Sequence, residues 1–334
     1  MTKKPAKKSA PKKQTPPAAR STTGEQMMRS IQKAIEGKDF ASFDDLNAYL
    51  ATLSGSLMRD KPEDGESSFK DEAQQLAFEA MEAGSEAGAR KLAKRALKLD
   101  PDCVDALVLL TSLEARSAME AIAGLQKAVE AGERSLGAQF IAENKGHFWL
   151  ILETRPYMRA LGELANLLRG EGLRLEALKI YEKMLELNPN DNQGVRDALL
   201  GLYLAVGELA AAGKLLKKYE LDSMANFAWG RALERYLAGD LKSAAAALKK
   251  ARKANGFVEL YLTGQKPIPK EMPGMYSPGS EEEAILCVDM LAAAWVEHKD
   301  ALFWLLDNCQ GKVSNILAMT SAGKKAPGAG KKLQ

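Results

Sequence analysis

The sequence predicts an all-α protein, and three observations support this fold class. Aromatic residues make up only 6% of the chain, whereas Ala, Leu, Lys and Glu are abundant. Strands collect β-branched and aromatic residues, so this balance favours helices. Apolar residues recur at helical spacing almost everywhere between residues 25 and 310. Two separate stretches also share one spacing of small and apolar residues, which indicates a repeated unit of paired helices.

The N-terminal part of the chain divides into a tail, an extension and a first block of repeats. Residues 1–24 contain four prolines and almost nothing apolar, so we expect a disordered tail. Residues 25–68 are expected to form a helical extension, and residues 69–131 the first repeats. The predicted helices here span 25–36, 43–53, 69–83, 86–98 and 103–115, with a loop over 55–67.

The repeat is visible as one spacing that occurs twice. It relates Ala89, Leu92, Ala93, Ala96 and Pro101 to Ala177, Ile180, Tyr181, Met184 and Pro189. Weaker copies begin at Ala121, Ala211 and Ala244. Small residues let the two helices of a pair approach closely, and the proline ends a pair because it cannot continue a helix. Each pair leaves an apolar face that only the next pair can cover, so the pairs are expected to stack into a superhelix.

This spacing resembles the tetratricopeptide repeat family, whose period is about 34 residues. The resemblance implies a right-handed superhelix of helical hairpins over residues 69–131 and 156–263, interrupted by an insertion at 132–155. The phrases that begin at Gly146, Glu153 and Leu187 look like those of bacterial tetratricopeptide proteins of unassigned function. The C-terminal stretch is similar to the suppressor-of-tumorigenicity-seven family, through Tyr261-Leu262, Gly279-Ser280-Glu281, Trp295 and Ala301-Leu302. Neither family implies a known chemistry.

The chain after the last repeat is expected to cap the superhelix. A short helix is predicted at 257–262, and the four prolines between Gly264 and Ser280 predict a loop that acts as a flap or a linker. Helices follow at 281–298 and 300–308, with Ser280 as N-cap before three glutamates that favour a helix start. Residues 264–310 therefore form the Pro-rich loop and capping helices, and 311–334 a C-terminal segment that ends in a disordered basic tail.

The net charge of +3 conceals a division between the tails and the body. The two tails, residues 1–24 and 321–334, carry 11 positive charges and no acid, which leaves 36 basic against 44 acidic residues in the remainder. The N-terminal lysines are Lys3, Lys4, Lys7, Lys8, Lys12 and Lys13. Such lysines can neutralise phosphates without reading sequence, because no aromatic residues stand between them to stack on bases. The alternative is a tail that only keeps the protein in solution.

A catalytic, metal or cofactor site is not predicted. His147 and His298 are the only histidines, and neither has a carboxylate or cysteine at motif spacing. Cys287, His298 and Cys309 lack the short paired spacing of zinc sites. The run from Asn188 to Asn192 resembles a calcium loop only superficially, because Leu199 stands where the closing glutamate should be. Three cysteines in a long chain give no disulfide framework, so the expected location is the cytoplasm. No stretch is apolar enough to predict a membrane span.

The inner groove of the superhelix is the predicted binding site, since the first helix of each pair lines it in this family. The residues expected there are Arg159, Asn166, Arg169, Asn192, Gln193, Arg196, Tyr203, Asn226, Trp229 and Tyr236. Arginine binds carboxylates bidentately, and Tyr and Trp are common interface anchors. The arrangement is similar in kind, though not residue for residue, to the carboxylate-binding groove of chaperone-binding tetratricopeptide proteins. In the alternative interpretation the arginines form internal salt bridges and Trp229 belongs to the core.

The sequence therefore predicts a scaffold or adaptor, without enzymatic activity, that holds an extended acidic segment of a partner protein in its groove. The second hypothesis is a nucleic-acid- or ribosome-associated protein that makes weak contacts through its lysine tails and uses the repeats as a platform. Both hypotheses exclude insertion into a membrane.

Overall fold

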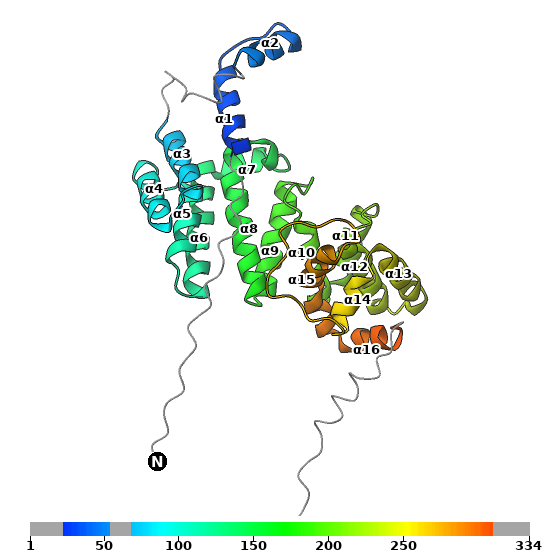
Figure 1. Ribbon diagram of the computed structural model, residues 1–334. Helices are drawn as coiled ribbons and strands as arrows, with labels where there is room; N and C mark the ends of the chain where they lie inside the picture. The colour runs from blue at the N-terminus through cyan, green and yellow to red at the C-terminus, as the bar shows by residue number, and fades with distance from the viewer. Residues whose placement is uncertain (1–22, 54–67, 310–334) are drawn as a thin grey trace, which may run out of the picture. The chain divides into compact units, whose positions relative to one another are not determined.

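The structure is a computed structural model, and it describes residues 23–53 and 68–309 (Figure 1). These residues form helices, turns and loops, with no strand among them, which confirms the predicted all-α class for the described part of the chain. None of the described helices combines the length and the apolar character that a membrane crossing requires. The predicted basic tails and the loop over residues 55–67 lie outside the described residues.

The described residues belong to two compact units, one that ends at Asn192 and one that starts at Gln193. The first unit holds α1 (Thr23–Ile35), α2 (Phe43–Leu53), α3 (Phe69–Met81), α4 (Glu86–Leu99), α5 (Val104–Glu114), α6 (Ala118–Leu136), α7 (Ala138–Glu143), the 3-10 turns η1 (Phe148–Leu150) and η2 (Leu152–Thr154), α8 (Arg155–Gly170) and α9 (Arg174–Leu187). The second unit holds α10 (Val195–Val206), α11 (Leu209–Lys218), α12 (Ala225–Leu237), α13 (Leu241–Ala254), α14 (Phe257–Leu262), α15 (Glu281–Glu297) and α16 (Lys299–Asp307).

Three helical hairpins build the first unit: α3 with α4, α5 with α6, and α8 with α9. Their first helices form a row, in which α3 packs against α5 and α5 against α8. Small residues make these contacts close, since Ala77, Ala93 and Ala106 are fully buried in one cluster. A Cβ atom added to Gly132 of α6 would lie 2.6 Å from the ring of Tyr157 on α8. The close approach that small residues at the repeat positions predict is thus present in this unit.

The stretch predicted as an insertion contains mostly helical structure. Helix α6 continues to Leu136, and Gly137 turns the chain with a φ of 81°. Helix α7 and the two 3-10 turns follow, and Arg155 starts α8 one residue before Pro156. A proline is tolerated there because the first helical N–H groups have no partner within the helix.

The second unit has two hairpins, α10 with α11 and α12 with α13, and a helix that lies across them. Helix α15 packs against both α10 and α12 (Figure 1). Gly201 on α10 permits this contact, because a Cβ atom there would lie 2.1 Å from the carbonyl oxygen of Met290. Helix α15 also packs against α14 and α16. Helix α15 therefore covers apolar surface on α10 and α12, the first helices of the two hairpins.

Candidate binding faces

The row of first helices in the first unit carries a half-buried arginine between two carboxylates. Arg159 on α8 lies 2.5 Å from Asp105 on α5 and 2.5 Å from Glu25 on α1, measured between guanidinium nitrogens and carboxylate oxygens. Its side chain is 19% exposed, that of Glu25 11% and that of Asp105 1%. Burial opposes the charge, but Asp105 and Glu25 outweigh it and hold the pKa of Arg159 above its ordinary value. The guanidinium therefore stays charged and acts as a carboxylate-binding group.

Helix α1 touches the row at several further points. Arg29 donates a hydrogen bond to the carbonyl oxygen of Leu152, at 2.9 Å, and lies over the ring of Phe78, 5.9 Å from its centroid. Lys33 forms an ion pair of 2.9 Å with Asp71 on α3. The contacts are mainly polar, and Met27 and Met28 stay substantially exposed. Charge and hydrogen bonds, more than apolar burial, thus hold α1 against the row.

The other groove residues predicted in the first unit differ in how exposed they are. Asn166 is exposed and accepts a hydrogen bond of 2.6 Å from the hydroxyl of the buried Tyr181. Arg169 is half-buried near the end of α8, and Asn192 is exposed after α9. Arg159 and Asn166 are seven residues apart on one helix and so share a face.

Arg196, the arginine predicted to line the groove of the second unit, pairs with side chains of that same unit. Arg196 forms an ion pair of 3.0 Å with Asp222, and its guanidinium carbon lies 5.2 Å from the ring centroid of Tyr219 and 5.9 Å from that of Phe227. The alternative reading of this arginine, an internal salt bridge, therefore matches the structure. Gln193, just before the same helix, is half-buried.

The aromatic and amide residues predicted to line the groove of the second unit are buried, and Trp229 is covered by α15. Trp229 is 0% exposed, donates its indole N–H to the carbonyl oxygen of Asn255 at 3.0 Å, and meets Trp295 of α15 edge-on at 6.4 Å. Tyr203 and Asn226 are 8% and 6% exposed. The prediction that these three residues line an open groove is wrong, because all three side chains are buried, and Trp229 packs against Trp295 of α15.

Tyr236 lies at the edge of the same region. It is half-buried, and its ring centroid lies 5.0 Å from that of Trp304 on α16. The lysines predicted for nucleic-acid contact, Lys3 to Lys13, lie outside the described residues.

A buried polar node, which the sequence did not reveal, attaches α15 to the helices beneath it. Glu283 accepts hydrogen bonds from the backbone N–H groups of Ala225 (3.0 Å) and Gly279 (2.7 Å) and from the side-chain amide of Asn255 (2.9 Å). Its exposed fraction is 5%. In the sequence Glu283 is one of three glutamates at a helix start, and nothing local distinguishes it from Glu281. Its partners are up to 58 residues away.

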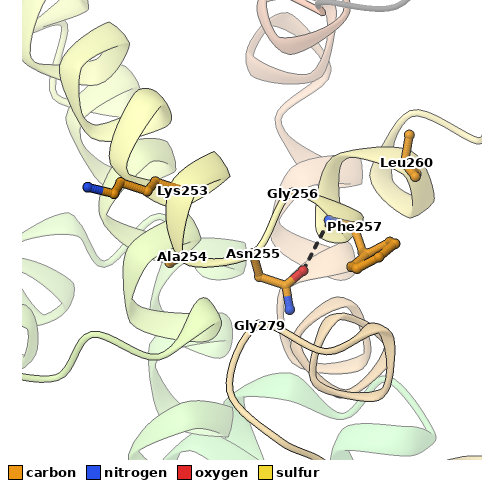
Figure 2. A pocket seen from close by; sticks show the side chains of 7 residues that line it. All are labelled: Lys253, Ala254, Asn255, Gly256, Phe257, Leu260 and Gly279. Atoms are coloured by element: carbon orange, nitrogen blue, oxygen red, sulfur yellow. Dashed lines mark hydrogen bonds between the residues drawn. The ribbon is translucent and has the colours of Figure 1, made fainter.

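A hollow of about 400 Å³ lies beside this node, between the end of α13 and the start of α14 (Figure 2). Lys253, Phe257 and Leu260 border it. The side-chain oxygen of Asn255, which also lines the hollow, accepts a hydrogen bond of 3.0 Å from the backbone N–H of Phe257. Its side-chain amide group donates hydrogen bonds to the carbonyl oxygen of Ser280 and to the carboxylate of Glu283. The polar atoms of the Asn255 side chain are thus already occupied by internal partners and are not offered to a small molecule.

The thiols and histidines do not assemble into a metal site among the described residues. Cys103 and Cys287 are buried, and burial raises the pKa of Cys103 to about 12 and that of Cys287 well above its ordinary value. A protonated thiol is a poor nucleophile and a poor metal ligand. His298 contacts the carbonyl oxygen of Leu204 at 2.7 Å and so lies in a packing position.

The Pro-rich loop between α14 and α15 is attached at both ends. Lys266 forms an ion pair of 2.6 Å with Glu281, which also accepts a hydrogen bond from the hydroxyl of Tyr261. Gly279 is held by Glu283. Between these points, Ile268 and Met275 are 55% and 86% exposed.

The contact between Tyr261 and Glu281 gives a prediction about pH. The carboxylate raises the pKa of Tyr261 to about 12, with burial as the second cause, because ionising the phenol would place two negative charges side by side. The neutral phenol is favoured in the folded protein. The resulting stability is present below the ordinary tyrosine pKa of about 10 and is lost as the pH rises towards 12.

In Glu281→Gln we therefore expect one tyrosine to ionise at a lower pH than in the parent, observed as absorbance at 295 nm. Glu271→Gln removes the same charge from an exposed loop position and should leave the titration unchanged. Superimposable curves for the parent and Glu281→Gln would contradict this contact.

Comparison with known protein families found no family that matches the chain, and comparison with curated proteins found no matching relative.

Proposed function

We propose that the protein is a cytoplasmic scaffold whose repeats hold an acidic segment of a partner protein. The observation that carries this proposal is the guanidinium of Arg159, which lies between two carboxylates on the row of first helices. Asp105 comes from the adjacent helix α5, whereas Glu25 comes from α1, 134 residues away in sequence. A carboxylate from a distant segment is the kind of ligand that an acidic partner would offer.

The arrangement of the helices supports a tetratricopeptide superhelix as the framework. Consecutive hairpins whose first helices form a row, with alanines and Gly132 at the closest contacts, are what the repeat pattern requires. In such a superhelix this row lines the inner surface. Cys103 and Cys287 form no disulfide, which fits a reducing compartment.

The proposed site is confined to the first unit. In the second unit α15 already packs across the first helices, and Trp229 is buried beneath it. A partner would have to remove this helix and expose that core. In the first unit α1 competes at Arg159 through polar contacts, and Arg159, Asn166 and Arg169 form the proposed binding surface.

Glu25 would act as an intramolecular substitute for the partner's carboxylate. Arg159, Asp105, Glu25 and Arg29 together carry no net charge, so a further carboxylate is favoured only after Glu25 leaves. A hydrogen bond to a charged group contributes roughly 1.5–3 kcal/mol. The loss of this hydrogen bond from the competing helix should therefore strengthen partner binding by at least about tenfold.

The test is a nuclease-treated pull-down from native lysate, read by mass spectrometry, with full-length baits. Glu25→Gln should capture more of a defined partner than the parent does. Arg159→Gln combined with Asp105→Asn should lose it; the double change removes the cation together with its carboxylate, so no unpaired buried charge remains.

The control bait is Arg90→Gln, which removes another ion-paired arginine, the partner of Glu114, from the same unit. It should capture the same partner as the parent. Circular dichroism establishes that each bait is folded. Equal capture by all four folded baits would refute the proposal, and loss in Arg90→Gln as well would assign the capture to unspecific charge.

A further inference from the structure

Charge is sharply divided in the second unit. Helices α11 and α13 together contain eight Lys or Arg residues and no Asp or Glu. The other residues between 193 and 309 contain six basic and 15 acidic residues. Acids flank the two helices at Glu208, Glu220 and Asp240 but do not enter them. In the first unit α9 carries three basic and three acidic residues, and α4 carries five basic residues and one acidic residue.

The lysines form an exposed stripe on each helix, opposite the face that packs inwards. On α11 they are Lys214, Lys217 and Lys218, and on α13 they are Lys242, Lys249, Lys250 and Lys253. All seven are exposed. Both helices pack against α12, through faces that contain buried residues such as Leu215 and Leu248.

These lysines have few internal counter-charges, although Asp240, just before α13, interacts electrostatically with Lys242. Within the described residues none of the seven forms a salt bridge, although Lys218 lies 5.1 Å from the ring centroid of Tyr219. Arg252 alone is paired, with Glu259 at 2.6 Å. Like charges four residues apart on a helix, such as Lys214 with Lys218 and Lys249 with Lys253, repel each other. A surface that only keeps a protein in solution mixes positive and negative side chains. Two helices that carry positive side chains alone therefore indicate binding to an external anion.

We propose that the stripes on α11 and α13 bind the phosphate backbone of a nucleic acid. Lysine is a flexible point charge suited to phosphates, and the stripes offer no exposed aromatic residue for base stacking, so binding is independent of sequence. From Lys242 to Lys253 the stripe extends about 16 Å along the axis at about 1.5 Å per residue. A polyanion that carries one charge per about 1.7 Å of duplex offers several phosphates over that length.

A lipid surface fits this region less well. Helices that bind membranes insert their apolar face among the lipids. In α11 and α13 that face is buried against the rest of the unit, with Leu216 and Ala251 at 4% and 0% exposure. The stripes therefore offer charge without an apolar anchor.

The proposal is tested by fluorescence anisotropy with labelled 20-nucleotide poly(U) and a 20-base-pair DNA duplex, from 50 to 300 mM salt. The parent is the full chain in which Lys3, Lys4, Lys7, Lys8, Lys12 and Lys13 are replaced by serine, so that the stripes are measured without these tail charges. The stripe variant adds Lys214→Glu, Lys217→Glu, Lys249→Glu and Lys253→Glu. We expect its affinity to fall at least about tenfold and the slope of log affinity against log salt to decrease by about 3.

The matched control adds Lys127→Glu, Lys179→Glu, Lys270→Glu and Lys299→Glu, which change the charge equally at exposed lysines elsewhere. It should bind within about threefold of the parent. Whether RNA or DNA binds more tightly identifies the natural polyanion. Equal losses in both variants, or unchanged binding in the stripe variant, would overturn the proposal. So would a parent that binds neither nucleic acid but binds phosphatidylserine vesicles.

Discussion

Trp229→Ala is expected to lower the free energy of unfolding by about 3–5 kcal/mol, the usual cost of truncating a fully buried tryptophan. The change opens a cavity between α12 and α15, removes the edge-on contact with Trp295, and leaves the carbonyl oxygen of Asn255 without its indole donor. The measurement is urea denaturation followed by far-UV circular dichroism, with tryptophan fluorescence as a second probe. Three of the four tryptophans lie in the second unit, so fluorescence reports mainly on that unit.

Trp304→Ala is the control for this prediction. Trp304 is half-buried in the same unit and stacks on Tyr236, so its truncation removes less apolar burial. We expect a cost of about 1–2 kcal/mol, scaled to the smaller area removed from the core. If both variants unfolded at the same urea concentration, α15 would not cover Trp229 in solution and the second groove would be open.

Gly201→Ala is expected to destabilise the protein by about 3 kcal/mol, although alanine is the better helix former. In an unobstructed helix the replacement would stabilise by about 1 kcal/mol. Here the new methyl group would lie 2.1 Å from the carbonyl oxygen and 3.0 Å from the carbonyl carbon of Met290. Backbone atoms in the middle of a helix cannot rotate aside, so α15 must move as a whole, at the upper end of the usual cost of overpacking.

Gly213→Ala on the neighbouring helix α11 is the matched control. Its new methyl group would approach Glu234 no closer than 3.6 Å, an ordinary contact, so the helix-forming gain should appear alone. Thermal unfolding of both variants should therefore shift in opposite directions from the parent. Stabilisation by Gly201→Ala would mean that α15 does not lie on α10.

The positions of the helices were largely predictable because the information is local. The ranges expected at 43–53 and 257–262 are those observed, and the helix expected at 281–298 ends one residue earlier. Apolar periodicity, serine caps and prolines all act within a few residues of where they stand. Ser280 caps α15 as its sequence position suggested, by accepting a hydrogen bond from the N–H of Glu283.

The candidate site was only half predictable. The sequence marked Arg159 as a carboxylate-binding residue but left open whether its ligand is internal. The structure supplies Glu25 from α1 and Asp105 from α5, 134 and 54 residues away. No periodicity links such distant residues, because ion pairs form wherever packing brings the charges together. The covering of Trp229 by Trp295 was not predictable either. In the sequence Trp295 is an apolar helix residue like many others, and nothing near it indicates which residue it contacts.

By itself, the sequence determined the helical class of the described residues, the approximate ends of their helices and the division of charge between lysine-rich and acidic segments. These properties depend on side-chain type and spacing along one chain. Only the tertiary structure decided which helix faces remain available. Helix α15 could have been placed at the end of the repeats or across their first helices, and it is apolar enough for either. Contacts such as Gly201 with Met290 and Glu283 with Asn255, between residues far apart in the chain, select the second arrangement.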